Sequence, residues 1–125
     1  MAHEYLIFIM ERPGDFDGFT REQEAVLDER HRAFVKRVED AGGAIIDGAP
    51  LENPEPLDRF TPQPDGTVLR TDGPFAESKE VVLGYYRIRA VNDEQAQEFA
   101  TWCPTARYVD LRRVYAPGES ITERS

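Results

Sequence analysis

Thr71-Asp72-Gly73-Pro74-Phe75-Ala76-Glu77-Ser78-Lys79-Glu80 is the stretch around which the rest of the chain is organised. Its Asp-Gly-Pro segment predicts a turn, because glycine admits a positive φ and proline fixes its own φ and restricts the residue before it. Polar residues follow closely, so the segment predicts a loop that holds the Asp72 carboxylate in a fixed place. An ordinary solvated β-turn explains the same residues equally well.

The residues before this stretch begin with a strand and a long helix. Residues 5–10 are apolar on both alternating faces and too few for a helix, which is typical of a central strand covered on both sides. Thr20 and Gln23 form a capping-box pattern, which predicts that a helix begins here. The helix is expected to end at Gly42-Gly43, since glycine is the usual residue after a helix C-terminus.

A proline-rich connection follows this helix. Residues 44–47 predict a second strand that Gly48 ends, and five prolines between positions 48 and 66 predict a long loop. This loop leaves room for at most a brief edge strand at residues 59–61, because proline cannot donate to a strand ladder. Asp65-Gly66 predicts a hairpin turn into a further short strand. A lid and a rigid bridge both remain open as roles for the connection.

The residues after the organising stretch predict strand, helix and strand. Residues 81–91 alternate in character along a strand. A helix is expected to begin at a cap on Asn92 or Asp93 and to stop at Pro104. Residues 106–115 then predict the last strand.

This order predicts an α+β, ferredoxin-like βαββαβ fold with an antiparallel sheet and a hairpin and loop inserted before the third main strand. Residues 1–115 are expected to form a single domain and residues 116–125 a polar tail. Two helices cover only one face of a four-stranded sheet, so the apolar residues of the other face need a cover. Homodimerisation through the sheet faces is the simplest cover.

Composition excludes several classes of function. The formal net charge is −9 and no run of Lys and Arg is present, which argues against nucleic-acid binding. The longest apolar run, residues 5–10, is far short of the roughly 20 residues that span a bilayer, and no secretory signal is seen. Cys103 is the single cysteine, which suits the cytoplasm. No motif for a nucleotide cofactor or a metal is present, so neither is expected.

The organising stretch, together with Leu83-Gly84-Tyr85-Tyr86, resembles the signature of the DGPF-type proteins within the YCII-related family. The similarity continues through Trp102-Cys103-Pro104 and covers most of residues 4–115. This resemblance implies a dimeric α+β barrel, a ferredoxin-like fold that pairs through its sheets. DGPF-type proteins often resemble companions of alternative sigma factors, so the resemblance also implies a sigma factor as a protein partner.

His31 is the main candidate for a catalytic residue. It lies at i+4 from Leu27 and i−3 from Phe34 in the apolar stripe of the first helix, so it is expected to face the sheet. A hydrogen-bonded core histidine explains this position too. Paired with Asp47 or Asp72, His31 would be an acid or base that works near neutral pH.

The resemblance strengthens the case for His31. In YCII-type proteins a histidine stands eleven positions before the glycine of an Ala-Gly pair, as His31 stands before Gly42, and a His–Asp pair is the suspected active site. Tyr86 and Arg87 are candidates for substrate binding, since a phenol donates a hydrogen bond and a guanidinium holds a carboxylate. Packing on a sheet face or at a dimer rim accounts for both residues as well.

Two functions stay open from the sequence. One is an enzyme that uses a His–Asp acid–base pair on a small, lactone-like or anionic metabolite, by analogy with related barrels that handle muconolactone-type compounds. The other is a non-catalytic ligand-binding or regulatory module associated with a sigma factor.

Overall fold

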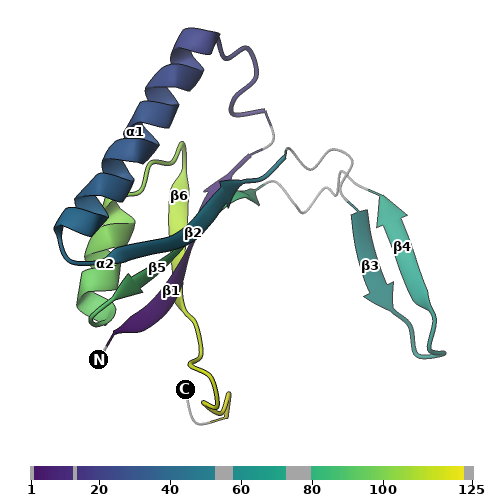
Figure 1. The fold of residues 1–125 in the computed structure, drawn as a ribbon. Helices are drawn as coiled ribbons and strands as arrows, with labels where there is room; N and C mark the ends of the chain where they lie inside the picture. The colour runs from purple at the N-terminus through teal and green to yellow at the C-terminus, as the bar shows by residue number, and fades with distance from the viewer. Residues whose placement is uncertain (1, 13, 53–57, 73–79, 123–125) are drawn as a thin grey trace.

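A computed structural model describes residues 2–12, 14–52, 58–72 and 80–122 (Figure 1). Four strands form an antiparallel sheet in the order β2-β5-β1-β6, and β3 and β4 form a separate two-stranded sheet. Both helices lie against one face of the larger sheet, so the predicted ferredoxin-like α+β fold is confirmed. The elements are β1 (His3–Glu11), α1 (Arg21–Asp40), β2 (Ala44–Pro50), β3 (Asp58–Pro62), β4 (Val68–Asp72), β5 (Val81–Ala90), α2 (Asp93–Trp102) and β6 (Tyr108–Arg113).

The start of α1 follows the local sequence. The Thr20 hydroxyl accepts a hydrogen bond from the Gln23 amide at 3.1 Å, and the Gln23 side chain accepts one from the Thr20 amide at 2.8 Å. These two bonds satisfy amides that the first helical turn leaves without partners, so the predicted capping box is confirmed. The helix ends just before Gly42, whose φ of 89° is a conformation that suits glycine.

The core lies between the helices and the covered face of the sheet. Alternate residues of β1 point at the helices, and α1 and α2 each contribute two buried side chains. The fully or nearly fully buried apolar residues are Tyr5, Ile7, Ile9, Phe34, Val38, Ile88, Ala90, Ala96, Phe99 and Cys103. Because side chains alternate along a strand, Leu6, Phe8 and Met10 lie on the opposite face, which we call the open face.

The second strand is longer than the sequence predicts. β2 continues through Gly48 to Pro50, and its residues pair with β5 as Gly48 with Tyr86 and Pro50 with Gly84. The prediction that Gly48 ends the strand is therefore wrong. A proline is tolerated here because β2 is an edge strand, where an amide need not pair on both sides.

The inserted hairpin agrees with the prediction in outline. β3 includes the expected residues 59–61, and Gly66, with a φ of 88°, lies in the turn that leads into β4. The last strand, β6, is shorter at both ends than the expected 106–115. The Gly73–Lys79 part of the organising stretch lies outside the described residues, so its predicted turn is not described.

Candidate active site

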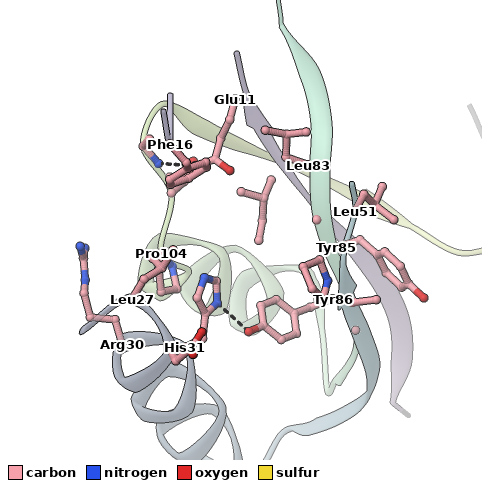
Figure 2. A pocket seen from close by; sticks show the side chains of 18 of the residues that line it. Glu11, Phe16, Leu27, Arg30, His31, Leu51, Leu83, Tyr85, Tyr86 and Pro104 are labelled. Carbon is pink, nitrogen blue, oxygen red and sulfur yellow. Dashed lines mark hydrogen bonds between the residues drawn. The ribbon is translucent and has the colours of Figure 1, made fainter. Parts of the chain in front are cut away.

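A cavity of about 630 Å³ opens beside α1 at one end of the sheet (Figure 2). A volume of this size suits a small molecule. Its walls come from the ends of β1, β2 and β5, from the segment before α1 and from the segment after α2. The apolar lining includes Ile9, Phe16, Phe19, Leu27, Leu51, Leu83 and Pro104, and the polar lining includes Glu11, Asp17, Asp28, Arg30, His31 and Tyr86.

His31 reaches this cavity from α1. The imidazole is half-buried, and its Nδ1 lies 2.7 Å from the Tyr86 hydroxyl oxygen. Burial lowers the pKa of His31, while the nearby Asp28 carboxylate raises it and Arg30 lowers it further. The imidazole is therefore neutral near pH 7 and can both donate and accept a hydrogen bond.

Tyr86 brings its hydroxyl to His31 from β5. Its ring packs against Phe34, with 4.9 Å between the ring centroids, and burial raises the pKa of Tyr86 to about 12. The phenol therefore stays protonated at neutral pH. Gly48 of β2 lies beside the ring, and a Cβ at this position would be only 2.7 Å from Tyr86 Cδ1. The absence of a side chain at Gly48 is what gives the Tyr86 ring its space.

Glu11 is a functional candidate that the sequence reasoning missed. Its side chain is only 5% exposed, and its Oε2 accepts a hydrogen bond from the Ala106 amide at 2.9 Å. Burial raises the pKa of Glu11, the Ala106 amide lowers it, and the Asp15 carboxylate raises it. Figure 2 shows Glu11 and His31 extending into the cavity from opposite sides. The strand expected over residues 5–10 stops one residue short of Glu11, although Glu11 continues the inward alternation of Tyr5, Ile7 and Ile9.

Of the residues expected at the site, the structure brings His31 and Tyr86 together. Asp47 is exposed and pairs in register with Arg87, on the face of the sheet opposite Tyr86. It therefore lies away from His31, although a pairing of the two was expected. Arg87 donates to the Glu4 carboxylate from Nε at 2.8 Å and from Nη2 at 2.6 Å, and it does not line the cavity. Asp72 is the last residue of β4, in the separate two-stranded sheet.

Two further observations concern the part of the chain that the structure describes. Within it, no group of three or more His, Cys, Asp and Glu side chains is placed to hold a metal ion. Neither helix is long and apolar enough to cross a bilayer.

The fold and the cavity together define a small α+β protein with a ligand-sized pocket at one end of its sheet. The chain belongs to the YCII-related family, since the YCII-related domain matches residues 3–116. This match confirms the resemblance to the YCII-related family seen in the sequence. The matched residues include every element that lines the cavity. A comparison with curated proteins found no match.

Proposed function

We propose that the protein is a cytoplasmic enzyme that transfers protons to and from a small, lactone-like metabolite held in the cavity. The observation that carries this proposal is that His31 and the buried Glu11 extend into one largely apolar cavity from opposite sides. Proton transfer at a bound molecule needs a group that takes the proton and a second group that donates a hydrogen bond or a proton where negative charge develops.

The environments of the two groups suit this chemistry. Burial keeps His31 neutral, and burial also raises the pKa of Glu11 from that of an exposed carboxyl toward neutral pH. A group works best in proton transfer when its pKa lies near the working pH. Carboxyl and imidazole groups with perturbed pKa values in a pocket are a typical mark of an active site.

The lining favours a lactone-like over an anionic metabolite. Glu11, Asp17 and Asp28 line the cavity, and among the described lining residues Arg30 is the one arginine or lysine. Arg87, which was expected to hold a carboxylate, is engaged by Glu4 on the open face. A neutral ring compound avoids repulsion from the acidic groups, and its carbon skeleton fits the apolar walls.

A panel of five- and six-membered lactones tests the proposal, with isomerisation or hydrolysis followed by NMR. We expect His31→Asn and Glu11→Gln each to lower turnover by about 10²-fold or more, since general acid–base groups contribute typically 10²–10⁴-fold. Tyr115→Phe, which changes a hydroxyl on the C-terminal segment, is the control and should keep full activity. Undiminished turnover in both site variants would overturn the proposal.

The same proposal includes a homodimer that forms through the open face. Leu6, Phe8 and Met10 lie on this face, and both helices lie on the other side of the sheet. A second copy offers an identical apolar surface, and two sheets packed face to face bury both. Light scattering with Phe8→Glu tests this: the wild type should have the mass of a dimer and the variant that of a monomer. A monomeric wild type would contradict the proposal.

A second candidate function is a non-catalytic module that binds a protein partner such as a sigma factor. The observation that favours it is the β3–β4 hairpin, which projects from the sheet (Figure 1) and exposes Phe60 by 61% and Val68 by 59%. Direct titration of a purified sigma factor tests this role. Binding that Phe60→Ser weakens would support it, and unchanged binding or none would refute it.

A further inference from the structure

The hydrogen bond between His31 and Tyr86 has two possible directions with different consequences. A neutral imidazole carries one N–H and one free lone pair, and the bond made at one nitrogen determines what the other presents. Nδ1 of His31 lies 2.7 Å from the Tyr86 hydroxyl oxygen. If Tyr86 donates, Nε2 carries the hydrogen; if Nδ1 donates, Nε2 carries the lone pair.

The surroundings of the Tyr86 hydroxyl favour the first direction. The ring is half-buried between Phe34 and the Gly48 segment of β2. Among the residues that the structure describes, the hydrogen-bond partner recorded for this hydroxyl is His31 Nδ1. If Nδ1 donated, the phenol O–H would have to find an acceptor in the cavity, whereas an O–H that donates to Nδ1 satisfies both groups with one bond.

We propose that Tyr86 holds His31 as the Nε2–H tautomer, so that His31 offers the cavity a hydrogen-bond donor and the ligand is a carbonyl compound whose oxygen accepts it. This inference rests on the proposed function and adds the role of each group. Tyr86 is a positioning residue, since it acts through His31.

With His31 as the hydrogen-bond donor, the proton acceptor in this proposal is Glu11, the buried carboxylate that enters the cavity from the opposite side. Its carboxylate takes a proton from the carbon next to the carbonyl, and the C–H electron pair forms a C=C bond. The C=O pair moves onto the oxygen, where the Nε2–H bond stabilises the negative charge. In a ligand with a second C=C bond next to the carbon that loses the proton, the product of this step is a dienolate. Glu11 returns the proton to the far carbon of the dienolate while the pair on the oxygen re-forms C=O, and the C=C bond has moved into conjugation with it. Atoms and electrons balance, and no oxidant or second reactant is needed.

Nitrogen-15 NMR of the histidine rings tests the tautomer without any substrate. The chain has two histidines, so comparison with His31→Asn assigns the His31 signals. Spectra are recorded at about pH 8, above the ordinary histidine pKa of about 6.5. We expect a pyridine-type shift for Nδ1 and a pyrrole-type shift for Nε2. A pyrrole-type Nδ1 would overturn the proposal.

Two variants separate the role of Tyr86 from general effects on the fold. Tyr86→Phe removes the hydroxyl and keeps the ring that packs on Phe34, so both His31 nitrogens should move toward the averaged shifts of mixed tautomers. Tyr115→Phe, remote from the cavity, should leave them unchanged. Unaltered His31 shifts in Tyr86→Phe would refute the positioning role.

A matched pair of probes tests the ligand class. Acetophenone and α-methylstyrene have the same skeleton, but only acetophenone carries an oxygen that accepts a hydrogen bond. Acetophenone should shift the His31 Nε2 signal and α-methylstyrene should not. Equal shifts with both probes, or none with either, would refute a carbonyl ligand at His31. If His31→Asn loses turnover but Nδ1 of the wild type has a pyrrole-type shift, the proposed enzyme function is supported and only the tautomer assignment is refuted.

Discussion

Gly48→Ala is expected to destabilise the protein and to disturb the His31–Tyr86 pair together. The new Cβ would lie 2.7 Å from the Tyr85 carbonyl oxygen and 2.7 Å from Tyr86 Cδ1. A Cβ essentially never lies within 3.0 Å of another heavy atom outside its own chain neighbours, so both distances are strongly repulsive. The carbonyl belongs to the backbone of β5 and cannot rotate away as a side chain can, so the two strands must separate locally.

The size of the effect follows from this crowding. Forcing an extra carbon against atoms that cannot move aside typically costs about 1–3 kcal/mol of stability. With a urea dependence of about 2 kcal/mol per molar, the unfolding midpoint falls by roughly 0.5–1.5 M. Because the second close contact is the Tyr86 ring, the nitrogen-15 signals of His31 should also change.

Gly84→Ala is the matched control, because Gly84 lies on the neighbouring strand of the same ladder. A Cβ there would be 3.4 Å from the Ala49 carbonyl oxygen and 3.4 Å from Ile9 Cδ1, which is ordinary contact. Urea unfolding of wild type, Gly48→Ala and Gly84→Ala should therefore give the lowest midpoint for Gly48→Ala. Equal midpoints for Gly48→Ala and wild type would refute the claim that the Tyr86 ring needs the space that Gly48 leaves.

Three further predictions concern pH and helix capping. Burial lowers the pKa of folded His31, so its contribution to stability is complete above about pH 6.5 and is lost as the pH falls through the folded pKa. Urea midpoints of wild type should therefore fall more than those of His31→Asn between pH 8 and pH 5; parallel curves would contradict this. Burial raises the pKa of Glu11, so its contribution is complete below about pH 4.3, the ordinary value, and is lost as the pH rises through the folded pKa. Glu11→Gln removes the buried charge but keeps an acceptor for the Ala106 amide, so this variant should be at least as stable as wild type at pH 8. A lower urea midpoint for the variant at pH 8 would show that the charge of Glu11 does not destabilise the fold. Thr20→Ala removes the N-cap of α1 and should lower the free energy of unfolding by about 1 kcal/mol, whereas Thr122→Ala in the C-terminal segment should change it little. Equal urea midpoints for the two variants would show that the Thr20 cap does not stabilise the protein.

The fold was largely predictable because its signals are local. The capping box at Thr20 and the apolar run of β1 each involve residues that are close together in the sequence. The predicted helix start and the predicted strand are both present in the structure. The helical position of His31, four residues from Leu27, likewise placed its side chain beside the sheet, where it meets Tyr86.

Asp47 shows how a small irregularity defeats such reasoning. Strict alternation from Ile45, which pairs with Ile88, would turn Asp47 to the helix side of the sheet with His31. The register of β2 shifts between Ile45 and Asp47, and Asp47 then pairs with Arg87 on the open face. One extra residue in a strand moves the following side chains to the other face, and nothing in the local sequence marks that position.

The sequence by itself determined the order of the elements, the sheet-facing side of α1 and the acidic character of the chain, because these depend on periodicity and composition. Only the tertiary structure decided which groups share the cavity. The buried Glu11 carboxylate accepts a hydrogen bond from the amide of Ala106, which lies far along the chain. Tyr86 reaches His31 because Gly48 leaves room for its ring. Both arrangements depend on contacts between distant segments, and such contacts form only when the sheet and its helices pack.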